Sequence, residues 1–177
     1  MATVDLASLA AEENFIEGLG GQLARDISVL LDRQHSKLRC DSVSATGAEI
    51  WFKARFNLSH GQEVVDKIRL YLSKADAVRL GADLVKAPNA ASLIKLDAMP
   101  EMVQDGMHEL ANVVAPALAR ALKPLLGQAW SCRLADVATG PLRVPEDPTR
   151  WSLRAEFLLR GFPEPFLFYF QLPKTLG

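Results

Sequence analysis

The segment His108-Glu-Leu-Ala-Asn112 holds the side chains best suited to chemistry in this chain of 177 residues. Glu109 supplies a carboxylate and Asn112 a carboxamide, and the spacing of three residues puts both on one face of a helix, one turn apart. Asp105 shares that outward sector. A neutral amide has one acceptor and two donors, so it can orient a water beside an anion without repelling the anion.

The same segment nearly matches the zinc motif HExxH, which offers an alternative interpretation. Zinc needs a nitrogen, sulfur or carboxylate donor at the position that Asn112 occupies. The other two histidines, His35 and His60, lie in segments without ligand spacing. We therefore predict neither a metal site nor another cofactor of its own. His108 is expected at the surface, since no partner for a general-acid role is visible.

A long helix over residues 98–126 must position these side chains. Asp97 is the expected cap, Pro100 falls in the tolerated first turn, and Gly127 ends the helix. The buried stripe comprises Val103, Met107, Leu110, Val114, Leu118, Ala121 and Leu125.

The other elements follow from periodicity. Ser73, with Asp76 three residues on, indicates an N-cap. Alternating patterns predict strands, and the proline-containing stretches predict a connector and a loop. The expected elements are a helix over 7–34, strands over 37–46, 50–56 and 68–72, a helix over 73–86, a connector over 87–92, and strands over 129–138, 151–160 and 166–172 with a loop over 140–148.

The two halves of the chain echo each other. Three pairs of segments match in the same order: 37–47 with 130–140, 53–56 with 154–157, and 70–74 with 170–174. When the two long helices are included, the offsets between matching segments range from 91 to 101 residues. Chance similarity among amphipathic strands is the alternative, but the shared order favours an internal duplication. We predict one α+β domain with half-repeats over 7–86 and 97–174. Its helix–three-strand units form one β-sheet with two long helices on a face, in pseudo-twofold symmetry.

Composition narrows the class of protein. Hydrophobic residues make up 49% of the chain and the formal net charge is −1, without a block of Lys and Arg. This pattern lacks the basic footprint of a nucleic-acid binder and the polybasic patch of a membrane-surface protein. No apolar run approaches the ~20 residues that cross a bilayer. Cys40 and Cys132 form no CxxC pair. We expect a cytoplasmic protein that binds neither nucleic acid nor membrane.

The segment from Asp105 to Val114 resembles the signature helix of the CheC/CheX family of chemotaxis phosphatases, whose motif is Glu-x-x-Asn. The stretch over 71–81 resembles the family's passage from a strand to a short helix. Asn14-Phe-Ile-Glu17 resembles the opening of the first helix of CheX, without its proline. With the duplication, the resemblance covers most of the chain.

The resemblance implies hydrolysis of the aspartyl phosphate on a CheY-like response regulator. Asn112 would orient the attacking water and Glu109 would pair with the regulator's active-site lysine. Independently of the resemblance, Asp105 and His108 are candidate accessory residues beside this pair. The Mg²⁺ would belong to the regulator. A motif in the second half alone resembles CheX, whose members are dimers, so a homodimer is also implied.

The first half departs from the motif. An offset of 91 residues sets Gly18 and Gly21 opposite Glu109 and Asn112, and a slip of one residue sets Glu17 and Gly20 there. Either way the Asn is missing, which predicts at most one active site per chain.

Pro116 is a second departure from the motif. It has no backbone N–H, so the carbonyl of Asn112, four residues before it, should lose its helical hydrogen bond and the helix should kink. These departures keep open an alternative, a non-catalytic CheC/CheX-like module that binds a response regulator or a flagellar-switch component. An unrelated duplicated α/β protein is the third possibility.

Overall fold

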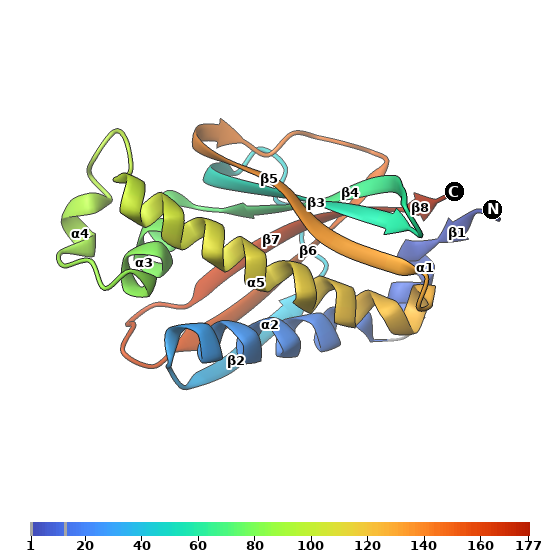
Figure 1. Cartoon of the computed structure of the whole chain (residues 1–177), viewed down its shortest axis with the longest axis horizontal. Helices are drawn as coiled ribbons and strands as arrows, with labels where there is room; N and C mark the ends of the chain where they lie inside the picture. The colour runs from blue at the N-terminus through green and yellow to red at the C-terminus, as the bar shows by residue number, and fades with distance from the viewer. Residues whose placement is uncertain (1, 13) are drawn as a thin grey trace.

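The computed structural model describes residues 2–12 and 14–177. One six-stranded antiparallel sheet carries two long helices, α2 and α5, side by side on one face (Figure 1). In chain order the elements are β1 (Val4–Asp5), α1 (Leu6–Glu12), α2 (Phe15–Leu31), β2 (His35–Asp41), β3 (Glu49–His60), β4 (Glu63–Leu72), α3 (Lys74–Leu84), α4 (Ala90–Leu93), α5 (Glu101–Leu126), β5 (Trp130–Arg143), β6 (Arg150–Leu159), β7 (Phe166–Pro173) and β8 (Thr175–Leu176).

The sheet confirms the predicted pseudo-twofold arrangement. Its strand order is β2-β6-β7-β4-β3-β5, and exchanging the corresponding strands of the two helix–three-strand units gives the same order read from the other end. Leu70 of β4 pairs with Phe170 of β7, flanked by the pairs Arg69 with Gln171 and Tyr71 with Tyr169. The local twofold axis therefore passes between Leu70 and Phe170. These equivalent residues of the two halves are 100 positions apart, as predicted.

The predicted offset of 101 residues between β3 and β6 is wrong. Ala54 lies opposite Leu70, and Leu153 lies opposite Phe170, so equivalent residues of β3 and β6 are 99 apart. A shift of two residues leaves every side chain on its own face of a strand, so hydrophobic alternation cannot detect it. The half-repeat boundaries of 7–86 and 97–174 stay a prediction.

The two long helices bury equivalent faces at the predicted offset of 91 residues. Four buried residues of α2 correspond in this way to four buried residues of α5, and the pairs are Leu19 with Leu110, Leu23 with Val114, Ile27 with Leu118 and Leu31 with Leu122. These faces pack on a sheet core rich in phenylalanine, in which Phe52, Phe56, Phe157, Phe166, Phe168 and Phe170 are fully buried.

The single helix predicted over 7–34 is wrong. The chain forms α1 and α2 there, and the two are separated around Asn14, which has the left-handed φ of 51°. Asp32 adopts φ 52° and ends α2 three residues earlier than predicted, so that β2 occupies His35–Asp41 rather than 37–46. Asn and Asp tolerate this conformation better than other L-residues. This tolerance explains why α2 begins after Asn14 and ends before Asp32.

Further boundaries differ from the prediction. Strand β3 covers Glu49–His60 rather than 50–56, and β4 covers Glu63–Leu72 rather than 68–72. Helix α5 starts after Pro100, whose extended ψ of 143° makes it the N-cap in place of Asp97. The segment predicted as a connector contains the short helix α4. Strand β5 continues through Gly140 and Pro141 into the predicted loop. Because β5 is an edge strand, a proline without an N–H is tolerated there.

At the chain ends, β1 and β8 form a separate two-stranded sheet that the sequence did not predict. The N-cap of α3 is confirmed, since the side chain of Ser73 accepts a hydrogen bond of 3.2 Å from the backbone N–H of Asp76. None of the helices within residues 2–12 and 14–177 is long and apolar enough to cross a membrane.

Candidate functional site

Glu109 and Asn112 both lie exposed on the outward face of α5, one turn apart, as predicted from their spacing. The intervening residues Leu110 and Ala111 are buried, as are Met107 and Val114. Because these buried residues lie before, between and after the pair, the packing of α5 on the core determines where the backbone of Glu109 and Asn112 lies.

Neither side chain bonds to another of the residues that the structure describes. Over residues 2–12 and 14–177, two α5 side chains make hydrogen bonds, from Gln104 Nε2 to the carbonyl oxygen of Met99 at 2.9 Å and from Arg120 to the Asp26 carboxylate. Within the residues that the structure describes, Glu109 and Asn112 form no hydrogen bond or ion pair. Both are therefore free to meet groups of another molecule.

A close crossing of α3 and α5 lies beside Glu109. Gly81 of α3 and Gly106 of α5 meet there without side chains between them, since a Cβ on Gly106 would stand 2.7 Å from the Gly81 carbonyl oxygen. This contact brings Leu84 and Val85 next to α5. The result is an open hollow of about 360 Å³, lined by Leu84, Val85, Asp105, Gly106, His108 and Glu109.

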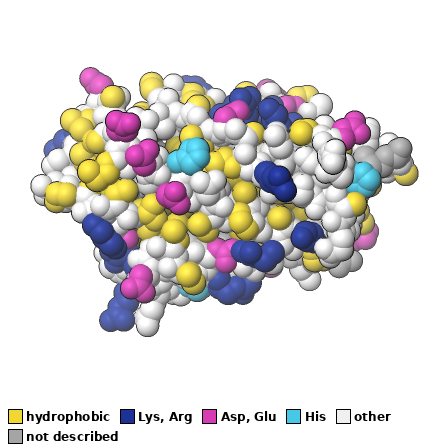
Figure 2. Space-filling view, viewed as in Figure 1, with side chains coloured by type: hydrophobic (Ala, Val, Ile, Leu, Met, Phe, Trp, Pro, Cys, Tyr) yellow, Lys and Arg dark blue, Asp and Glu magenta, His cyan; other side chains and the backbone are white. Residues whose placement is uncertain are grey.

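Asp105 and His108 are thus brought together with Glu109 at one surface feature. All three side chains are exposed. Figure 2 shows acidic side chains and a histidine beside hydrophobic ones over the N-terminal half of α5. Asn112 lies one turn further along the helix than Glu109.

Helix α3 is itself held firmly against its surroundings. Its Asp83 accepts two hydrogen bonds, of 2.8 and 2.5 Å, from Arg33 in the α2–β2 connection. Its Asp76 accepts hydrogen bonds from Arg79 at 2.5 Å and from the backbone N–H of Leu167 at 3.1 Å. The wall of the hollow opposite α5 is therefore fixed in place.

Pro116 lies on the exposed side of α5, four residues after Asn112. It has no N–H to donate to the carbonyl of Asn112. The helix nevertheless runs uninterrupted from Glu101 to Leu126. The kink that the sequence suggested stays a prediction.

The corresponding position in the first half of the chain carries no motif side chains. Gly18 lines a shallow groove of about 240 Å³ between the start of α2 and the end of α5, and the groove is otherwise lined by Asn14, Phe15, Gln22, Arg120, Ala121, Pro124 and Leu125. At the offset of 91 residues, Gly18 and Gly21 correspond to Glu109 and Asn112. The two positions equivalent to Glu109 and Asn112 therefore carry neither the carboxylate nor the amide of the motif, although the side chains of Asn14 and Gln22 line the groove.

The two cysteines have no features of a nucleophile. Both are buried, Cys40 in β2 and Cys132 in β5. Burial raises the pKa of Cys40 to about 11 and that of Cys132 to about 12. The thiols therefore stay protonated near neutral pH. In the described residues, no group of three or more His, Cys, Asp or Glu side chains could hold a metal ion.

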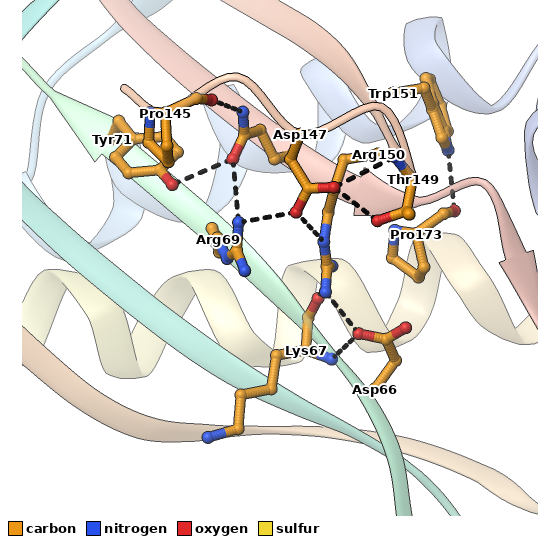
Figure 3. Close-up of polar contacts among 11 residues, drawn as sticks. Asp66, Lys67, Arg69, Tyr71, Pro145, Asp147, Thr149, Arg150, Trp151 and Pro173 are labelled. Carbon is orange, nitrogen blue, oxygen red and sulfur yellow. Dashed lines mark hydrogen bonds and ion pairs between the residues drawn. The ribbon is translucent and has the colours of Figure 1, made fainter. Parts of the chain in front are cut away.

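A polar network that the sequence analysis did not single out lies on the other face of the sheet (Figure 3). Gln171, only 2% exposed, accepts a hydrogen bond of 3.0 Å from the Tyr71 hydroxyl and donates one of 3.3 Å to the carbonyl oxygen of Pro145. Arg69 pairs with Asp147. The network fastens the β5–β6 loop over the sheet and does not touch α5. Strand alternation puts Arg69 and Tyr71 opposite the core, but no sequence signal pairs them with that loop.

The hollow beside Glu109 was also missed by sequence reasoning. Gly81 and Gly106 belong to different helices, and nothing in either segment indicates that they meet. Of the residues that line it, the sequence analysis identified Asp105, His108 and Glu109, which belong to the motif segment or flank it.

Comparisons with solved structures show which proteins share this fold. No protein-family model and no curated protein matches the sequence. The fold matches FliY from Thermotoga maritima, with a TM-score of 0.62 and 16% identity, over 90% of this chain and 86% of FliY. It matches CheX from Desulfovibrio desulfuricans with a TM-score of 0.61 and 10% identity, over 89% of this chain and 97% of CheX.

A third match is the middle domain of FliM from H. pylori, with a TM-score of 0.66 and 9% identity, over 96% of this chain and 94% of that domain. Matches at such low identity establish the architecture of the chain and nothing finer. The duplicated helix–three-strand units on one antiparallel sheet agree with it. The chain has the fold of the CheC/CheX family.

Proposed function

We propose that the chain is a phosphatase that hydrolyses the aspartyl phosphate of a CheY-like response regulator in the cytoplasm. The observation that carries the proposal is the exposed, uncommitted pair Glu109 and Asn112, one turn apart on a long helix of a CheX-like fold. The motif and the fold support the proposal independently, because the first is a local sequence pattern and the second rests on the whole chain.

Asn112 orients the attacking water in this mechanism. An acyl phosphate is already activated, so its hydrolysis needs a nucleophile in line and stabilised charge rather than a covalent intermediate. The amide oxygen of Asn112 accepts a hydrogen bond from the water, while its neutral side chain does not repel the phosphoryl group. A hundredfold acceleration over the regulator's own hydrolysis corresponds to about 3 kcal/mol.

Glu109 serves as the docking carboxylate and pairs with a lysine in the regulator's active site. With Glu109 one turn from Asn112, that pairing would fix the rotation of the amide relative to the phosphate. The chain contributes no metal or cofactor of its own in this scheme, and Mg²⁺ is held by the regulator. One site per chain is expected, since Gly18 and Gly21 replace the motif in the first half.

A homodimer is part of the proposal, as the resemblance to CheX implies. Sedimentation equilibrium tests this part separately from catalysis. A mass twice that of the chain at micromolar concentration supports the homodimer, and a monomer across that range contradicts it.

The test of the function is loss of radiolabelled phosphate from purified CheY-like regulators in the presence of Mg²⁺. Added chain is expected to accelerate the loss from at least one regulator, in proportion to the chain concentration. No acceleration across a panel of regulators, with the chain folded by circular dichroism, would contradict the proposal.

A second candidate is a non-catalytic module that binds a response regulator or a flagellar-switch component. The similarity to the FliM middle domain and to a chain of the FliG–FliM complex from H. pylori favours it. So do Gly18 and Gly21, which replace the motif residues in the first half of the chain. Binding to a phosphorylated regulator or to a switch protein without any acceleration of phosphate loss would support this candidate.

A further inference from the structure

The hollow at the crossing of α3 and α5 combines an apolar wall with an acidic rim. Leu84 at the end of α3 and its C-cap Val85 form the wall, and Gly106 of α5 contributes no side chain. Asp105 and Glu109 stand on the opposite side. They are four residues apart on one helix, so their Cβ atoms lie roughly 5–6 Å from each other.

The negative charge of this rim is not neutralised within the chain. In the part of the chain that the structure describes, no ion pair engages Asp105 or Glu109. On the α3 side, Asp83 is paired with Arg33, and the exposed Lys86, two residues after the helix, forms no ion pair with any described residue. His108 is the remaining titratable group of the lining. The hollow therefore presents two uncompensated carboxylates next to apolar carbon.

Lysine and arginine side chains match this combination. Each has an aliphatic stem that packs on apolar surface and a cationic end that stays at the rim. A stem lying on Leu84 and Val85 would bring its charged end to Asp105. The exposed Met102, one turn before Asp105 and 59% accessible, extends the apolar surface on which a partner would rest.

We infer that the hollow receives a cationic side chain of the regulator, held by Asp105, in addition to the lysine that pairs with Glu109. The inference deepens the proposed function and rests on it for the identity of the partner. A regulator seated on Asn112 lies directly over the hollow, because Gly106 and Asn112 are fewer than two turns apart on α5. Asp105 and the α3 wall then select regulators that carry a basic residue at this position.

The chemistry of the hollow can be tested without any regulator. The probe is Nα-acetyl-lysine methylamide, titrated into the ¹⁵N-labelled chain and followed by amide chemical shifts, with the uncharged Nα-acetyl-leucine methylamide for comparison. The lysine probe is expected to shift the amides of Leu84, Val85 and Asp105 with millimolar affinity, and added NaCl should weaken it. Equal shifts with the uncharged probe would overturn the inference.

A matched pair of variants separates Asp105 from the general field of the helix. Asp105→Asn is expected to weaken the lysine probe about threefold, as for the loss of one exposed ion pair. Glu101→Gln removes the same charge from an exposed position one turn upstream and is expected to leave the affinity unchanged. Equal weakening by both variants would assign the effect to overall charge and overturn the inference.

The regulator itself provides the second arm. Asp105→Asn should raise the regulator concentration that gives half-maximal phosphate loss by about threefold, with a smaller effect on the maximal rate. A change in the maximal rate alone would contradict a docking role. If no regulator is dephosphorylated by the unaltered chain, the proposed function fails, while the lysine titration still judges the hollow by itself.

Discussion

Gly106 of α5 lies against the backbone of Gly81 of α3. A Cβ on Gly106 would stand 2.7 Å from the carbonyl oxygen of Gly81, and a Cβ on Gly81 would stand 2.9 Å from the carbonyl oxygen of Val103. Both contacts are with backbone atoms, which cannot rotate away as a side chain can. The crossing therefore fixes how close α3 comes to Glu109, one turn beyond Gly106.

Gly106→Ala should lower the free energy of unfolding by about 1–2 kcal/mol, because the added methyl overpacks the crossing and forces α3 outward. Urea denaturation measures the change. Gly18→Ala is the matched control: Gly18 is also a helical glycine, but nothing lies within 4 Å of its added Cβ. That variant should gain stability, by about 0.5–1 kcal/mol, from helix propensity alone. Equal effects of the two variants would contradict a tight crossing.

Pro116→Ala should raise the free energy of unfolding by about 1 kcal/mol. Alanine restores an N–H that can donate to the carbonyl of Asn112, and it has the highest helix propensity. Pro116 is exposed, so little packing is lost. Thermal and urea unfolding of the two proteins measure the difference. Destabilisation by the variant would show that the surroundings require the proline ring.

The ion pair between Arg55 and Asp136 should contribute to acid sensitivity. Arg55 donates two hydrogen bonds, of 2.7 and 2.5 Å, to the Asp136 carboxylate, and these lower the pKa of Asp136 below its ordinary value of 3.8. A depressed pKa in the folded state gives stability that is present above pH 3.8 and is lost as the pH falls through the lower value.

Asp136→Asn should therefore lose less stability than the unaltered chain between about pH 5 and pH 2. Glu49→Gln is the control, since its pair with Arg143 has side chains 80% and 67% exposed and is expected to contribute little. Urea midpoints across this pH range compare the three proteins. Parallel pH profiles for the chain and for Asp136→Asn would contradict a stabilising role for the pair.

The fold could be predicted from the sequence where the spacing of apolar residues was regular. The apolar spacing of α5 and its match with α2 located the two helices, and the echo between 70–74 and 170–174 identified the strands that meet at the twofold axis. The break at Asn14 could not be predicted, because residues around it continue the helical pattern. The extension of β5 through Pro141 was missed because a proline is compatible with an edge strand and with a loop alike.

The candidate site divides in the same way. Glu109 and Asn112 are fixed relative to each other by helix geometry, which the sequence alone provides. Their exposure required only the apolar stripe of α5. The hollow beside them depends on the contact between Gly81 of α3 and Gly106 of α5, which are 25 residues apart in the sequence. Contacts of this kind are determined by tertiary packing.

The most direct test of the proposed phosphatase is the rate of phosphate loss from a phosphorylated regulator with the unaltered chain and with Asn112→Ala. Lys123→Ala is the control, because it truncates another exposed side chain of α5. We predict that Asn112→Ala loses nearly all of the acceleration while binding of the regulator persists, and that Lys123→Ala retains the acceleration. Full acceleration by Asn112→Ala would contradict the assignment of Asn112 as the residue that orients the water.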